Sequence, residues 1–183
     1  MANDAPGFFQ IRSLLAEETT LLETFLYEAI FIPEGVTPLP RSIVRDPSLS
    51  CYIDAFGSGA CDHALAAVLQ DGTVAGAVWT RLLADQASFA SNVPTLAIAV
   101  LPAHRGQGIG TALLHAMLRT LARHGWQRVA LSVQKANPAL RLYQRAGFTI
   151  VQDNDEELVM VREIMQGNDT RPMIGDHWSF FMM

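Results

Sequence analysis

The sequence predicts a single mixed α/β (α+β) domain, built on a central sheet of about six to seven strands. Hydrophobic residues make up 50% of the 183 residues and charged residues 17%, which supplies enough apolar surface for one substantial core. Segments with the period of strands and segments with the period of helices alternate along the chain. An apolar run at residues 95–101 leads directly into a glycine-rich turn and a helix pattern, an order typical of α/β folds.

The first part of the chain predicts a short strand and two helices. Residues 8–14 have a strand pattern, and apolar residues recur at helical spacing over residues 17–31, before Pro33. The proline-rich residues 33–40 are expected to form a loop that can shape the wall of a pocket. Asp46 and Pro47 have the order of an N-cap followed by a first helical residue, so a second helix is expected from here to Gly57.

The middle of the chain predicts a hairpin and a buried strand. Residues 62–83 hold two strand patterns around Asp71-Gly72, a dipeptide that favours a tight turn. After a loop at residues 85–94, the apolar residues 95–101 are expected to form a central strand that is buried on both faces. The helix after the glycine-rich turn should end at His124-Gly125.

The last part of the chain predicts a strand, a helix and a pair of strands. The strand covers residues 127–134, and the helix begins at Asn137-Pro138 and reaches Gly147. Residues 148–151 and 158–162 should pair across a polar turn at residues 153–157. Residues 1–165 are therefore expected to form one domain, followed by a C-terminal tail, residues 166–183, of unassigned structure.

Composition excludes several classes of function. The chain has 13 Lys+Arg and 18 Asp+Glu, a net charge of −5, which argues against nucleic-acid binding and suits a cationic or amine partner. No apolar run reaches the roughly 18 residues of a membrane helix, and Asp4 stands where a signal peptide has a basic residue, so we expect a cytoplasmic protein away from membranes. Cys51 and Cys61 are expected to be reduced core thiols, and the histidines lack metal-ligand spacing, so we predict no metal.

The glycine-rich turn, Arg105-Gly-Gln-Gly-Ile-Gly-Thr111, carries the chemical signal. Its glycines let backbone amides converge on an anion, and the start of the following helix adds positive potential, so the turn can bind a phosphate or pyrophosphate. The alternative is that the glycines only permit a tight turn. A Walker A loop is excluded because no lysine follows the glycines, and the third glycine comes too early for a dinucleotide fingerprint.

Two motifs resemble the GNAT superfamily of N-acetyltransferases. The first is the strand at residues 96–100 with the Arg-x-x-Gly-x-Gly turn, and the second is Asn137-Pro-Ala-Leu-Arg-Leu-Tyr-Gln-Arg-Ala-Gly-Phe148. The resemblance spans residues 8–164. It implies the GNAT fold, with helices on both faces of a mixed sheet and a splay between the fourth and fifth strands that holds acetyl-CoA.

The resemblance also implies which residues bind acetyl-CoA. The fourth strand would pair with the pantetheine arm, and the amides of the turn would hold the pyrophosphate. The side chain of Arg105 either contacts a phosphate or lies in solvent, and Asn137 can both cap its helix and reach the cofactor. The residues so implied are Ile98, Ala99, Val100, Arg105, Gly106, Gln107, Gly108, Ile109, Gly110, Thr111, Asn137 and Tyr143.

Tyr143 is the predicted general acid, because a phenol of pKa about 10 can protonate the departing CoA sulfur; plain core packing is the alternative. Many relatives carry a glutamate base on the fourth strand, and this chain has no carboxylate there. Glu34 in the proline-rich loop is the predicted base, with Asp54 or a chain of waters as alternatives. His63, Trp79 and Phe89 could line the acceptor pocket, although ordinary packing in the hairpin strands is the better explanation for the first two.

The resemblance implies an enzyme that transfers an acetyl group from acetyl-CoA to a primary amine, by direct attack in a ternary complex. The acceptor would be a small molecule, with a protein or peptide amine as a variant. The alternative is a catalytically silent acyl-CoA-binding sensor or regulatory module, which the missing carboxylate supports. The sequence leaves the acceptor and the oligomeric state open, a homodimer being one alternative.

Overall fold

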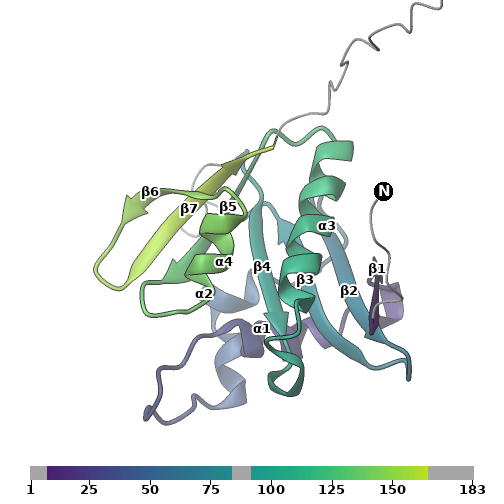
Figure 1. Ribbon diagram of the computed structural model, residues 1–183, viewed down its shortest axis with the longest axis horizontal. Helices are drawn as coiled ribbons and strands as arrows, with labels where there is room; N and C mark the ends of the chain where they lie inside the picture. Colours follow the sequence, from purple (N-terminus) through teal and green to yellow (C-terminus); the bar gives the residue numbers. More distant parts are fainter. Residues whose placement is uncertain (1–7, 84–91, 165–183) are drawn as a thin grey trace, which may run out of the picture.

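A seven-stranded mixed sheet forms the centre of the protein (Figure 1), whose computed structural model describes residues 8–83 and 92–164. The strand order is β1-β2-β3-β4-β5-β7-β6; neighbouring strands are antiparallel except β4 and β5, which are parallel. This confirms the predicted mixed sheet. The strands are β1 Phe9–Ser13, β2 His63–Leu69, β3 Val74–Arg81, β4 Thr95–Val100, β5 Arg128–Gln134, β6 Thr149–Asp153 and β7 Glu157–Glu163. The helices are α1 Leu21–Ala29, α2 Pro47–Ser50, α3 Ile109–Arg123 and α4 Leu140–Arg145, with 3₁₀ turns η1 Ala16–Glu18, η2 Arg41–Arg45 and η3 Pro102–His104.

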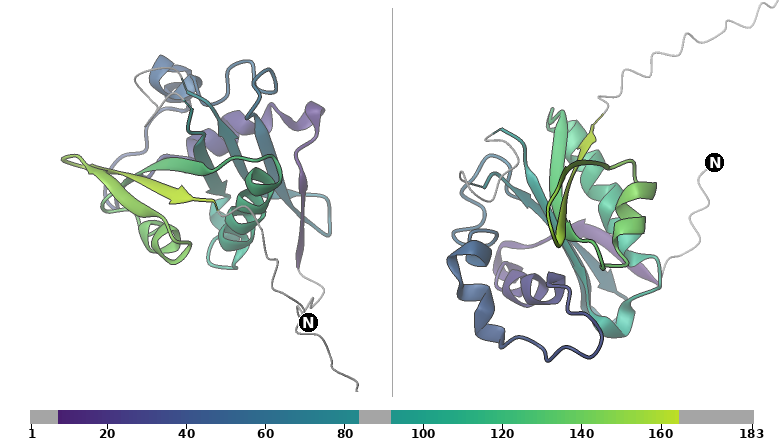
Figure 2. Two further views of the ribbon diagram at one scale, coloured as in Figure 1. Left: turned by 90° about the horizontal axis from the view of Figure 1, so that it is seen from above. Right: turned by 90° about the vertical axis from the view of Figure 1, so that its left-hand side faces the viewer.

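Helices cover both faces of the sheet, as predicted. Figure 2 shows the sheet between α1 and α2 on one side and α3 and α4 on the other. Alternate residues of each strand point to opposite faces, so the sheet serves two cores. The larger core packs the sheet against α3 and α4 and contains Leu113 and Met117. The smaller core packs Trp79 of β3 against Leu22 and Phe25 of α1.

The strands β4 and β5 separate along their length. They are joined at one end, where Thr95 pairs with Ala130, and no further pairing between them is found in the described residues. On its other edge β4 pairs with β3 throughout. This confirms the predicted splay between the fourth and fifth strands. It also corrects the expectation that the fourth strand is buried on both faces, because Ile98 and Val100 are only half-buried where the gap opens.

The first two helices are shorter than predicted. Residues 16–18 form a 3₁₀ turn, so α1 begins only at Leu21. The helix expected to run to Gly57 is a single turn, α2, followed by irregular turns in which Ala55 and Gly57 have positive φ angles of 50° and 98°. These left-handed residues cannot continue an α-helix. Its predicted start is confirmed, since the carboxylate of Asp46 accepts a hydrogen bond from the amide of Ser48 at 3.0 Å.

A buried ion pair fixes the segment after α2 to the sheet. The guanidinium of Arg81 donates to the Asp62 carboxylate at 3.1 Å and to the carbonyl of Asp54 at 2.7 Å. The Asp62 carboxylate also accepts from the amides of Gly57 and Gly59, at 2.9 and 3.1 Å. The Trp79 indole donates to the carbonyl of Tyr52 at 3.1 Å. Tyr52 is therefore held in place from β3.

We expect Asp62→Ala to lower the free energy of unfolding by about 3 kcal/mol, because the side chains of Asp62 and Arg81 are only 2% and 11% exposed and the substitution leaves a buried cation unpaired. Denaturant titration measures the loss. Asp153→Ala is the matched control: its pair with Lys135 is 65% and 42% exposed, so the loss should stay below about 1 kcal/mol. Equal losses in the two variants would show that burial does not set the strength of the Arg81 pair.

The remaining expectations concern cysteines, metals and membranes. Cys61 is a buried free thiol as predicted, whereas Cys51 is half-buried and corrects the expectation of a second core thiol. Within residues 8–83 and 92–164, no group of His, Cys, Asp and Glu side chains is arranged to hold a metal ion. In the same residues no helix has the length and apolar character needed to cross a membrane.

Candidate active site

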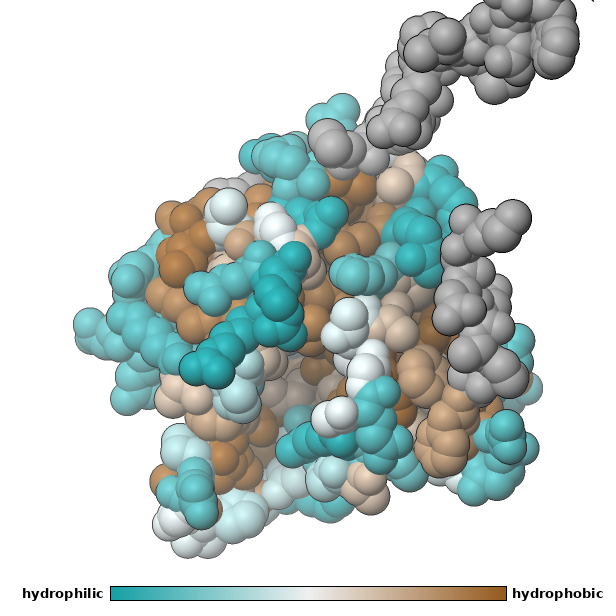
Figure 3. All heavy atoms as spheres, viewed as in Figure 1, coloured by the Kyte–Doolittle hydropathy of each residue, from teal (hydrophilic) through white to brown (hydrophobic). Residues whose placement is uncertain are grey.

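Two cavities meet in the gap between β4 and β5. The loop cavity, of about 410 Å³, reaches Arg105 and Gly110 of the glycine-rich turn. The α2 cavity, of about 210 Å³, reaches Leu49 and Tyr52 beside α2. Figure 3 shows the molecular surface hollowed between α3 and α4, with apolar residues in the depth. The residues that line both cavities, and so mark their junction, are Ala29, Ile30, Phe31, Ile98, Asn137 and Tyr143.

The glycine-rich turn leaves a run of backbone amides without partners. Gly106 and Gly108 have φ angles of 74° and 81°, which glycine adopts readily, and Gly108 is the N-cap of α3. Within the described residues, none of the amides of residues 106–111 donates a hydrogen bond; the first to do so is that of Ala112, to Gly108 at 3.0 Å. These free amides at the start of a 15-residue helix can receive an anion.

The edge of β4 that faces the gap offers backbone groups to a ligand. The amide of Leu101 donates to the carbonyl of Ala75 in β3 at 2.9 Å. Because the peptide groups of a strand alternate between its two edges, those of Ile98 and Val100 point into the gap. An extended ligand can therefore pair with β4 as an added strand.

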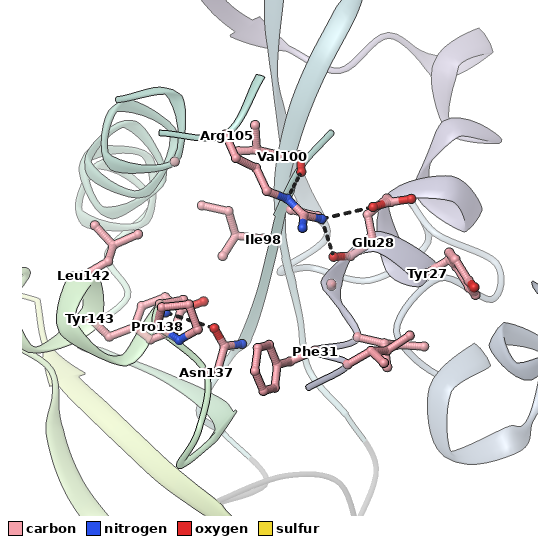
Figure 4. Close-up of a pocket in the computed structure, with 16 residues that line it drawn as sticks. Tyr27, Glu28, Phe31, Ile98, Val100, Arg105, Asn137, Pro138, Leu142 and Tyr143 are labelled. Atoms are coloured by element: carbon pink, nitrogen blue, oxygen red, sulfur yellow. Dashed lines mark hydrogen bonds and ion pairs between the residues drawn. The ribbon is translucent and has the colours of Figure 1, made fainter. Parts of the chain in front are cut away.

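The side chain of Arg105 connects the turn to α1. Its Nε donates to the carbonyl of Val100 at 2.9 Å, and its Nη2 lies 3.0 Å from the carboxylate of Glu28 (Figure 4). The Arg105 side chain is thus 54% exposed to solvent and paired with Glu28, and its contact with a phosphate stays a prediction. Arg105 neutralises Glu28 and ties β4 to the end of α1 across the loop cavity.

Tyr143 lies at the junction of the two cavities. It is 7% exposed, and its ring packs edge-on against Phe148 with 6.0 Å between the ring centroids. Burial raises the pKa of its phenol to about 12, so the hydroxyl is protonated at neutral pH. That hydroxyl makes no hydrogen bond to any residue in the described ranges. The ring is thus a packing element, and the hydroxyl is a free donor.

Asn137 shares the junction with Tyr143. Its Oδ1 accepts a hydrogen bond from the amide of Ala139 at 2.9 Å, in the turn before α4. This corrects the predicted helix start at Asn137, because α4 begins at Leu140 and its N-cap, Ala139, has no side-chain cap. Figure 4 shows the amide of Asn137 between Pro138 and Phe31, with its nitrogen on the side of Phe31. The hydrogen bond of the oxygen therefore leaves the nitrogen available to a ligand.

Several predicted site residues lie elsewhere. Glu34 is exposed in a turn and lines neither cavity, and Asp54 is exposed and accepts a hydrogen bond from Ser50. His63 packs against His124, with 4.2 Å between ring centroids, and Trp79 is fully buried in the smaller core. Phe89 lies outside the described residues. Among the turn residues, Gln107 and Thr111 are exposed, whereas the side chain of Ile109 is in the core, so Ile109 can contribute its backbone only.

The structure adds three lining residues that the sequence reasoning missed: Phe31, Tyr52 and Glu157. Phe31 follows α1, in the stretch expected to be helical. Burial raises the pKa of the Tyr52 phenol to about 12, with smaller contributions from Cys51 and from the charge of Glu157. Glu157 is the first residue of β7, although the sequence places it in the polar turn before that strand. Its pairing opposite Gln134 separates it from the turn, and a single sequence does not display that pairing.

Comparisons with known proteins agree with this architecture. A family model described as "Acetyltransferase (GNAT) family" matches residues 28–148. A mycothiol acetyltransferase of Acidimicrobium ferrooxidans is 40% identical over 91 residues, which are 49% of this chain and only 29% of that relative.

Two solved structures share the fold. The ribosomal-protein-S18-alanine N-acetyltransferase of Escherichia coli has a TM-score of 0.60 and 21% identity, covering 88% of this chain and 97% of its own. A phosphinothricin acetyltransferase of Sinorhizobium meliloti in complex with AcCoA has a TM-score of 0.59 and 18% identity, covering 93% and 96%. With the family model matching well over half of its residues, the chain belongs to the acetyltransferase (GNAT) family.

Proposed function

We propose that the protein is an N-acetyltransferase that moves an acetyl group from acetyl-CoA to a primary amine. One observation carries the proposal: an anion-binding turn, an unpaired strand edge and a free phenol hydroxyl all border one continuous pair of cavities. Acetyl-CoA has a pyrophosphate, an amide-bearing arm and a thioester in that order. The arrangement of these groups therefore matches the order of the groups in the co-substrate.

Each part of acetyl-CoA has a proposed partner in the loop cavity. The free amides of residues 106–111 would hold the pyrophosphate, with the α3 N-terminus adding positive potential. The backbone of Ile98 and the amide of Val100 would pair with the pantetheine arm. The amide nitrogen of Asn137 would donate to the same arm near the junction. Acetyl-CoA brings an activated acetyl group, and the chain's residues place it beside Tyr143.

Tyr143 is the proposed proton donor. Its pKa of about 12 keeps it protonated, and because this is above the pKa of a free thiol, about 8.5, full proton transfer to a thiolate is uphill. The hydroxyl is therefore best suited to stabilise charge on the sulfur by a hydrogen bond whose proton moves as the carbon–sulfur bond breaks.

The proposed transfer releases two protons from an acceptor that arrives as an ammonium ion. One leaves before attack and reaches water or a carboxylate. The other leaves the nitrogen once the amide bond forms, and it replaces the proton that Tyr143 gives to the sulfur. Glu34 is a proposed carboxylate for the first proton; it would have to act through water, since its turn lines neither cavity.

Two measurements on the whole chain test the proposal. Calorimetric titration should show acetyl-CoA binding, and a thiol reagent should detect free CoA when protein, acetyl-CoA and primary amines are mixed. Binding without thiol release from any amine would favour the silent sensor or regulatory module. Absence of both would contradict the proposal altogether.

A further inference from the structure

The described lining of the α2 cavity carries a negative charge and no positive one. Among the described residues that line it, Glu157 is the only charged one, and no lysine or arginine is present. Most of the rest are apolar or aromatic, including Leu26, Phe31 and Leu49. A carboxylate on the wall of such a cavity attracts a cationic group.

The pairing of β5 with β7 directs Glu157 toward the site. Glu157 lies opposite Gln134, and Ser132 lies opposite Val159 two residues further along. Residues that face each other across antiparallel strands, and residues two apart on one strand, share a face of the sheet. Glu157 is therefore on the face that carries Ser132, and both line the α2 cavity with Tyr143.

The other carboxylate near the junction is already neutralised. Glu28 lines the loop cavity and lies 3.0 Å from the guanidinium of Arg105. Glu157 has no ion pair with any residue in the described parts of the chain. Its charge reaches the phenol of Tyr52, whose pKa it helps to raise after the larger effect of burial. Of the described residues that line the two cavities, Glu157 is thus the one that offers an incoming cation an uncompensated negative charge.

We propose that Glu157 binds the ammonium group of the acceptor, and that the acceptor is a primary amine bearing a compact apolar group and no carboxylate or phosphate. This rests on the proposed acetyltransferase function and names its substrate class. The cavity volume of about 210 Å³ exceeds the roughly 150 Å³ of an engineered apolar cavity that binds benzene, so there is room for one ring or a short branched chain. Among the described lining residues, none is a cation that could pair with an acceptor's anionic group.

The test compares 2-phenylethylamine with phenylalanine, which has the same ring and amine and adds a carboxylate. The wild-type chain should acetylate 2-phenylethylamine with at least a tenfold higher kcat/KM. Glu157→Gln should raise the KM for 2-phenylethylamine about tenfold to a hundredfold, the range expected for loss of a charge-assisted hydrogen bond. It should also reduce the ratio of kcat/KM for 2-phenylethylamine to kcat/KM for phenylalanine. Changes in kcat should be smaller than those in KM.

Glu156→Gln is the matched control. It removes the same charge from the neighbouring residue, whose side chain is exposed and lines neither cavity. It should keep the wild-type KM and preference. An unchanged KM in Glu157→Gln, or the same shift in Glu34→Gln instead, overturns the assignment of Glu157. Wild-type preference for phenylalanine overturns the substrate class.

A binding measurement separates this inference from the function on which it rests. Calorimetric titration of 2-phenylethylamine into the protein saturated with CoA reports acceptor binding without turnover. Binding that weakens at least tenfold in Glu157→Gln and not in Glu156→Gln supports the ammonium site even if thiol release fails. Undetectable binding of 2-phenylethylamine to the wild-type complex overturns the inference, whatever the thiol assay shows.

Discussion

Tyr143→Phe should lower kcat by about 10²–10⁴-fold, the typical contribution of a positioned general acid. The substitution keeps the ring that packs against Phe148 and removes only the hydroxyl, which has no partner in the described residues. The free energy of unfolding and the affinity for acetyl-CoA should therefore stay close to those of the wild type. Steady-state rates of thiol release, with a denaturant titration of the same protein, check both expectations.

The packing role of Tyr143 is measured by a second substitution. Tyr143→Ala also removes the buried ring and should cost about 3–5 kcal/mol of stability, as large-to-small core changes do. If the kcat of the Tyr143→Phe variant stayed within a factor of about two of the wild-type kcat, Tyr143 would be a packing element only.

The pH dependence follows from the raised pKa of the phenol. Proton donation needs the neutral phenol. Burial raises the pH at which the phenol ionises from about 10 to about 12. Ionisation of Tyr143 should therefore cause no fall in kcat between pH 7 and pH 10. An alkaline fall in that range that is present in the wild type and absent in Tyr143→Phe would show that the bound complex has a lower phenol pKa.

Features encoded by local sequence were predicted well. The Asp71-Gly72 turn and the glycine-rich turn each depend on residues within a few positions of one another, and the structure has both. The length of α2 was not predictable in this way. It ends early because residues 51–62 follow the long-range contacts of Arg81 and Asp62 instead of helical periodicity.

The acceptor side of the site depends on contacts that a single sequence does not display. Tyr52 faces the gap because Trp79, 27 residues away, holds its carbonyl. Glu157 was indistinguishable from the acidic turn residues that precede it, since only its pairing with β5 separates them. The prediction of Glu34 as the base depends on its position beside prolines. Prolines limit the freedom of a loop, but they do not determine which way the loop faces.

Gly108→Asp should weaken acetyl-CoA binding about tenfold to a hundredfold, because it places a negative charge beside the amides proposed to hold the pyrophosphate. A Cβ at Gly108 would meet no atom within 4 Å, so the substitution creates no clash. The φ angle of 81° is left-handed, which Asp and Asn tolerate better than other side chains. Calorimetric titration with acetyl-CoA measures the change.

Gly108→Asn is the matched control, since it has nearly the same shape and the same strain but no charge. Asp and Asn are equally good N-caps, and a negative charge at the start of α3 interacts favourably with the helix dipole. The Gly108→Asp variant should therefore be at least as stable as the Gly108→Asn variant. If Gly108→Asp is no less stable than Gly108→Asn and yet binds acetyl-CoA more weakly, the lower affinity results from repulsion of the co-substrate's phosphates. Equal affinities in the two variants would mean that the glycines serve only the turn, and that the pyrophosphate binds elsewhere.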